Sequence, residues 1–248
     1  MELSIALLVL TASAVGGGIR RLGGFGGALI MSPVLMWVFP VTTLVILVML
    51  AEFLGGLWLS RHWKVDAMDL PRRNRLLGFS VVAIPVGMGL GTMVPIDGLR
   101  FATNVVVAAF SIYLFFSIHH QFQLSKGRDR AVGLLCGGLL GSCGIGGPPA
   151  VIYLNFSELE FNRARSLLSN FISGISISGV LIASVVVRDL SWLIWLPLVL
   201  GGYGVGLWAG GSVAERYADN AKMIKKICLL VLIVNAFVNM SIVIARLV

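Results

Sequence analysis

Two glycine-rich segments interrupt apolar stretches of this sequence, and both could bind an anion through the backbone alone. The first has the sequence GGFGG at residues 23–27, and the second has GIGGPP at residues 144–149. A helix that starts after each segment would leave N–H groups unpaired and carry a positive partial charge at that end. Because glycine lets a ligand approach the backbone closely, two such helix starts that meet would form an anion site.

The apolar surroundings of these two segments favour a transport site. Within lipid, a break in a helix is tolerated only where the freed backbone groups face protein or a water-filled cavity. Two breaks at corresponding places in two halves of a membrane protein indicate a substrate site, whereas a single break could simply kink packed helices. The backbone positions that we expect to bind the substrate are Gly24, Gly26, Gly27, Gly144, Gly146, Gly147 and Pro148.

Three charged residues lie close to, or inside, the same apolar stretches. Arg20 and Arg21 precede the first glycine-rich segment, and a charge at membrane depth is costly and usually functional. One of them could be a counter-charge for the substrate, or both could lie at a hairpin tip that reaches the cytoplasmic interface. Glu52 is an acid well inside an apolar run, which favours a proton-coupling role, unless it lies close enough to the inner interface to reach water.

Uncharged polar residues flank the second glycine-rich segment. Asn155 and Asn170 are the pair that we expect to face a cavity, although asparagines in apolar helices also serve as interhelical hydrogen-bonding groups. Cys143 adjoins the segment and could contact a sulfur-containing ligand, while a buried, unreactive thiol is the simpler interpretation.

The composition of the chain is that of an all-α polytopic membrane protein. Of its 248 residues 58% are hydrophobic and only 12% charged, and the mean hydropathy is +0.96. The formal net charge of +8 comes from basic residues in short loops, so we do not expect nucleic acid as a partner. The three histidines, His62, His119 and His120, are also in loops, and the spans lack a cluster of His, Asp and Glu. We therefore expect no cofactor, no metal and no catalytic residues.

The first apolar run resembles a cleavable signal peptide. Residues 3–10 are apolar and are followed by small residues at positions 12–14, but the only charge before them is Glu2. A signal peptide has a basic amino-terminal region, so we expect a retained first membrane segment instead.

Apolar runs and basic loops together predict the path of the chain through a membrane. Runs long enough to cross a bilayer are about 41–60, 76–94, 100–118, 166–187, 192–211 and 227–246. The loops rich in lysine and arginine, which the positive-inside rule places in the cytoplasm, are 61–75, 119–130 and 212–226.

From the number of crossings we infer that each glycine-rich region forms a hairpin. The region 131–156 must begin and end on the cytoplasmic side, and residues 131–145 would extend only about 22 Å as a helix, short of the roughly 30 Å apolar core. We therefore expect a re-entrant hairpin there. By the same count, 3–39 is a hairpin that begins outside, although its first limb is long enough for a nearly complete crossing.

Each half of the chain then contains one broken hairpin and three spans, and an odd number of spans inverts the second half. The predicted units are a first repeat at 1–118, a cytoplasmic linker at 119–130 and a second repeat at 131–248, with both termini outside. Inverted repeats of this kind are typical of secondary transporters. A series of glycines also recurs in the two halves, and we interpret it as close helix packing: Gly87, Gly89, Gly91, Gly202, Gly204, Gly206 and Gly210.

The glycine-rich segments resemble the paired motifs of the sulfite exporter TauE/SafE family. The resemblance rests on residues 24–27 with 33–35, and on 141–149 with Tyr153; residues 161–165 are similar to the family's segment before the next span. It covers essentially the whole chain. Two features depart from the pattern: Ala28 stands where a third glycine is common, and the pair Arg20-Arg21 is not usual in the family.

This resemblance implies a multi-pass protein of the bacterial cytoplasmic (inner) membrane that exports a small sulfur-containing anion, such as sulfite, sulfoacetate or a related organosulfonate. Coupling could be to protons through Glu52 or absent, because the membrane potential alone drives anions outward. The expected partners are the anion, the lipid bilayer and, as a candidate, a second copy of the chain in a homodimer. The alternatives are an anion channel on the same scaffold and a membrane enzyme or assembly protein.

Overall fold

A computed structural model describes residues 2–60, 65–116, 123–186, 190–216 and 220–247, and the regular elements in this part of the chain are all helical. The first half contains α1 Glu2–Gly23, α2 Gly27–Leu35, α3 Val41–Ser60, the short η1 Ala67–Asp69, α4 Leu70–Met93 and α5 Ile96–Phe115. The second half contains α6 Lys126–Cys143, α7 Pro148–Asn155, α8 Phe161–Val186, α9 Trp192–Arg216 and α10 Ala221–Leu247. The predicted all-α membrane class is therefore confirmed for the described residues.

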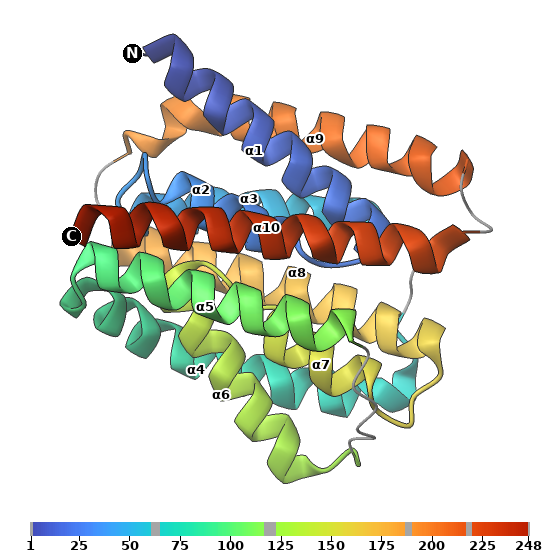
Figure 1. The fold of residues 1–248 in the computed structure, drawn as a ribbon. Helices are drawn as coiled ribbons and strands as arrows, with labels where there is room; N and C mark the ends of the chain where they lie inside the picture. The colour runs from blue at the N-terminus through green and yellow to red at the C-terminus, as the bar shows by residue number, and fades with distance from the viewer. Residues whose placement is uncertain (1, 61–64, 117–122, 187–189, 217–219, 248) are drawn as a thin grey trace.

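The helices form one bundle in which elements from the two halves pack together (Figure 1). The most extensive contacts are between α1 and α9 and between α4 and α6, followed by α3 with α8 and α5 with α10. The start of α1 and the end of α10 lie at the same end of the bundle (Figure 1).

Helix α3 lies at the centre of this bundle and carries Glu52. Its residues 44–49 are at most 1% exposed, and the helix is apolar on every side, as expected of a span surrounded by other helices. A carboxylate on such a helix reaches neither lipid nor bulk water easily, so its partners must come from the neighbouring helices.

Small residues let the outer helix pairs approach closely. A Cβ on Gly206 of α9 would collide with the carbonyl oxygen of Ala14 in α1, and a Cβ on Gly87 of α4 would collide with that of Gly138 in α6. The packing role predicted for the glycine series is confirmed at these two positions, whereas Gly204 faces open space.

Seven described helices are long and apolar enough to cross a membrane, and they include α1 as well as the helices over the six predicted runs. With 22 residues, α1 extends about 33 Å, so the first limb of the first hairpin has the length of a complete crossing. Helix α6 begins earlier than predicted and has 18 residues, or about 27 Å. The additional residues lie at the base of the second hairpin, so the mid-membrane dip of its tip stays a prediction.

Several residues used to assign the basic loops lie outside the described part of the chain. They are Arg61, His62 and Lys64 in the first loop, and residues 117–122, with both remaining histidines, in the second.

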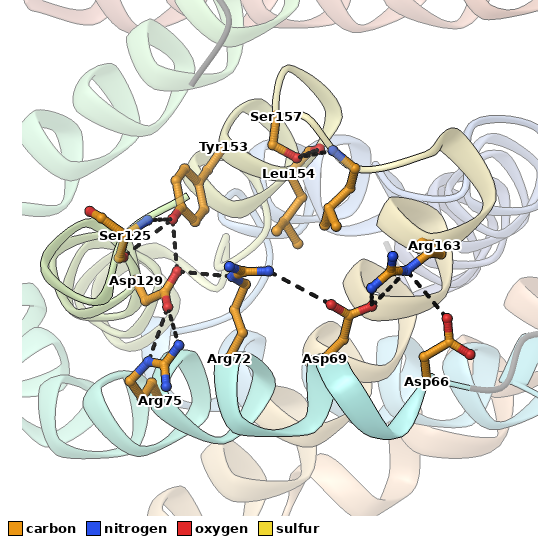
Figure 2. Close-up of polar contacts among 11 residues, drawn as sticks. Asp66, Asp69, Arg72, Arg75, Ser125, Asp129, Tyr153, Leu154, Ser157 and Arg163 are labelled. Carbon is orange, nitrogen blue, oxygen red and sulfur yellow. Dashed lines mark hydrogen bonds and ion pairs between the residues drawn. The ribbon is translucent and has the colours of Figure 1, made fainter. Parts of the chain in front are cut away.

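An ionic network fastens the base of the second hairpin to the starts of α4 and α8 (Figure 2). Asp129 of α6 is fully buried; it lies 2.8 Å from Arg75 and 3.4 Å from Arg72, and it accepts a 2.7 Å hydrogen bond from Tyr153 of α7. Asp69, before α4, lies 2.9 Å from Arg163 of α8. The structure thus brings together residues from three of the segments predicted to lie on the cytoplasmic side.

Candidate functional site

The two glycine-rich breaks line one cavity. Its volume is about 30 Å³, which is room for about two or three water molecules. Gly26 and Ala28 line it from the first break, and Gly144, Gly146 and Gly147 from the second. Pro148, Arg20, Glu52 and Ser176 also line it, and the rest of the lining is apolar.

At the first break, left-handed glycines turn the chain from α1 into α2. Gly24 and Gly26 have φ angles of 77° and 105°, a region that side chains other than glycine rarely adopt. The N–H of Gly24 donates to the carbonyl of Arg20 (2.9 Å), and the Arg20 guanidinium donates back to the carbonyl of Gly24 (3.0 Å). Arg20 is therefore held by the break that it precedes.

The second break is built in a similar way but without a charge. Gly144 ends α6 with a φ of 72°, and its N–H donates to the carbonyl of Leu140 (2.9 Å). Helix α7 begins at Pro148, as the sequence predicted, and proline suits this position because its missing N–H would have no partner there. Among the described residues, no hydrogen bond engages the N–H groups of Gly146 and Gly147, which leaves them as donors beside the cavity.

A buried carboxylate occupies the start of α2. Glu52 Oε1 accepts hydrogen bonds from the N–H of Ala28 (2.8 Å) and from the hydroxyl of Tyr203 in α9 (3.1 Å). Its Oε2 lies 3.4 Å from Nε of Arg20. Glu52 is 5% exposed and Arg20 is fully buried, so this is an ion pair inside the bundle and not at an interface with water. Glu52 therefore has little contact with solvent in this conformation.

Gly27 makes these contacts sterically feasible. A Cβ at this position would lie 2.7 Å from the Tyr203 hydroxyl and would collide with Oε1 of Glu52. At Gly147, the first residue before α7, the nearest atom to an added Cβ would be the Ile172 side chain at 3.7 Å, an ordinary contact. The first break is thus tightly enclosed by polar groups, and the second is bordered by an apolar side chain.

Arg20 has hydrogen-bonding capacity left over. Its Nη1 bonds Gly24, but Nη2 is buried and makes no hydrogen bond with any described residue. A buried charged donor without a partner is costly, and Arg20 lines the cavity. An anion in the cavity would supply the missing acceptor.

Three predicted site residues lie away from this cavity. The side chain of Arg21 packs against Gly211 of α9. Consecutive side chains of a helix point about 100° apart, so Arg21 points away from the cavity when Arg20 points into the bundle. Asn170 accepts a 3.0 Å hydrogen bond from Arg73 of α4, and Asn155 ends α7 at the other end of that helix from the break. Gly24 and Gly27 shape the first break without lining the cavity themselves.

Tyr203 is the site residue that the sequence analysis missed. It lies within the glycine series of α9, which we interpreted only as a packing surface, and it is 2% exposed. A tyrosine in an apolar helix needs a partner for its hydroxyl, and that need is the signal that could have identified it.

The donors around the cavity suit an anion. They comprise one guanidinium, the backbone N–H groups of the second break and the positive end of α7, whereas the start of α2 is occupied by the Glu52 carboxylate. The described residues hold no group of three or more His, Cys, Asp or Glu side chains that could bind a metal ion.

Comparison with protein families gives a match over most of the chain. The family model described as "Sulfite exporter TauE/SafE" matches residues 8–238, which includes both breaks, α3 and Tyr203. Neither the curated proteins nor the solved structures that were compared gave a match.

Proposed function

The chain belongs to the sulfite exporter TauE/SafE family, and from that premise we propose that it is a secondary transporter that exports a small sulfur-containing anion. Sulfite, sulfoacetate and related organosulfonates are the proposed substrates, and the bacterial cytoplasmic membrane is the proposed location. The family and the seven apolar helices already make the chain a multi-pass membrane protein of a transporter family.

The observation that carries the proposal is a buried cavity lined by both breaks and by a guanidinium that has an unused N–H group. We propose that the anion binds between Nη2 of Arg20 and the N–H groups of Gly146 and Gly147. A site of about 30 Å³ favours a compact anion over a bulky one.

We further propose that the chain is two inverted repeats, 1–118 and 131–248, joined by a cytoplasmic linker at 119–130, with both termini outside. The packing supports this division. If the helices of the first half are matched in order to those of the second, the contact of α1 with α9 corresponds to the contact of α6 with α4. The pairs α3 with α8 and α5 with α10 are each a helix in contact with its own counterpart, as two-fold related repeats would require.

Glu52 is the proposed proton-coupling group, because it is a buried acid that lines the substrate cavity. Glu52→Gln keeps the shape of the side chain and removes its charge. Transport by this variant in proteoliposomes should lose its pH dependence; a pH profile equal to that of the natural protein would exclude Glu52 and favour uniport driven by the membrane potential.

The test of the proposed site compares two leucine substitutions in the second hairpin. A Cβ at Gly146 would lie 2.9 Å from the Leu140 side chain, beside the cavity, whereas Gly138 has open space around its Cβ position. The assay measures uptake of radiolabelled sulfite into proteoliposomes in which the cytoplasmic face of the protein points outward. Gly146→Leu should abolish this uptake, and Gly138→Leu should retain it.

The same assay separates a transporter from a channel. Saturable flux with counterflow, in which unlabelled anion on one side accelerates movement of labelled anion from the other, supports the transporter. Flux that neither saturates nor shows counterflow would favour the channel.

A further inference from the structure

The Glu52 carboxylate makes the contacts that a bound anion would make at the start of α2. One oxygen takes the helix N–H of Ala28 and the Tyr203 hydroxyl, and the other faces Arg20. The residue before α2 is Gly26, which has no side chain to cap the helix, so this N-terminus is filled by a carboxylate from another helix.

The guanidinium of Arg20 does not use its full hydrogen-bonding capacity in its contact with Glu52. A carboxylate and a guanidinium pair most strongly through two parallel hydrogen bonds. Here the closest approach is 3.4 Å, from Nε, whose geometry is not that of a hydrogen bond, and Nη2 has no hydrogen-bond partner among the described residues. The guanidinium therefore has an N–H group available for a second oxyanion.

Charge and volume prevent the two anions from binding together. The groups that contact Glu52 are Arg20 from α1 and Tyr203 from α9; a further cation, Arg165 of α8, lies beside Gly24 and outside the lining of the cavity. One cation in a cavity of about 30 Å³ does not balance a carboxylate and a substrate anion at once. Like charges at such short range repel strongly in an interior of low dielectric constant.

We propose that Glu52 is a built-in competitor of the transported anion: its carboxylate holds Arg20 and the α2 N-terminus in the empty protein, and it must leave or be neutralised before an oxyanion binds there. This inference rests on the proposed function. It also assigns Tyr203 as a positioning residue, because its hydroxyl stabilises Glu52 in the competing position.

The experiment measures binding of radiolabelled sulfite to the purified protein in lipid nanodiscs at neutral pH. Glu52→Gln should bind sulfite about tenfold more tightly than the natural protein, since the amide still accepts from Ala28 and Tyr203 but no longer repels an anion. Tyr203→Phe should tighten binding by a smaller factor, because it weakens the hold on Glu52.

A second measurement distinguishes competition from a structural role. In Glu52→Ala the carboxylate position is vacated, so added acetate should occupy it and compete with sulfite, whereas acetate should not affect the natural protein at the same concentration. Thermal unfolding of each variant in the nanodisc identifies those that are folded at the binding temperature.

The outcomes separate this inference from the proposed function. Sulfite binding that Glu52→Gln leaves unchanged or weakens, without acetate competition in Glu52→Ala, overturns the competitor role and leaves the transporter proposal intact. If neither the natural protein nor any folded variant binds sulfite or sulfoacetate, both proposals are overturned.

Discussion

The α1–α2 hairpin and the α6–α7 hairpin both turn at a glycine-rich break on the same cavity, but their charged contacts lie at opposite ends. In the first hairpin the ion pair of Arg20 and Glu52 is at the break itself. In the second, the ionic contacts of Asp129 are at the base, and Leu140 and Ile172 border the break. Figure 2 shows how far this basal network extends between α4, α6, α7 and α8.

This difference assigns separate roles to the two breaks. The second break offers backbone donors without a competing charge, whereas the charged residues of the cavity lining lie at the first break: Arg20, which precedes it, and Glu52, which reaches it from α3. Binding of an anion should therefore depend on the guanidinium of the first break and on the backbone of the second. Paired substitutions can test this division.

The largest effect is expected for Arg20→Leu, which leaves Glu52 buried without its counter-charge. Removing one partner of a buried ion pair costs about 3–5 kcal/mol, so the free energy of unfolding should fall by that order and transport should be lost. The double variant Arg20→Leu with Glu52→Gln should recover much of the stability but none of the transport. Transport by the double variant would show that the first break supplies no charge to the substrate.

At the base of the second hairpin, Asp129→Asn should cost stability and not substrate affinity. The carboxylate contacts Arg75 and Arg72 and accepts from Tyr153. Hydrogen bonds to a charged group contribute about 1.5–3 kcal/mol, which sets the expected loss in free energy of unfolding. Sulfite binding by the folded variant should equal that of the natural protein, and a selective loss of binding would place the substrate near this network instead.

The smallest effects come from adding one methyl group at equivalent places in the two breaks. Gly27→Ala would force a Cβ against Glu52 and Tyr203 and should cost about 1–3 kcal/mol, as overpacking does. Gly147→Ala meets only Ile172 at 3.7 Å and should be nearly neutral. Unfolding of both variants in lipid nanodiscs gives the comparison; equal costs would contradict the difference between the breaks.

The membrane class, the two breaks and the start of α7 could be predicted from the sequence because each depends on local chemistry. Hydropathy identifies spans, and glycine and proline interrupt a helix wherever they occur. The tertiary contacts could not be predicted. Nothing local distinguishes Arg20 from its neighbour Arg21, yet one lines the cavity and the other packs on α9.

The partners of Glu52 and Asp129 show the same limit. Ala28 and Tyr203 are far from Glu52 in the sequence, and so are Arg75 and Tyr153 from Asp129. Which helices meet is decided by packing over the whole bundle, so a single sequence identifies these groups as polar residues in apolar helices without pairing them.

The most direct test of the central claim is to locate a bound anion. Selenite has the shape and charge type of sulfite, and its selenium atom gives an anomalous diffraction signal from crystals of the protein grown with it. We expect a single strong peak in the cavity, between Nη2 of Arg20 and the N–H groups of Gly146 and Gly147. A peak elsewhere in the bundle, in crystals of protein that transports selenite, would contradict the claim that the two breaks form the binding site.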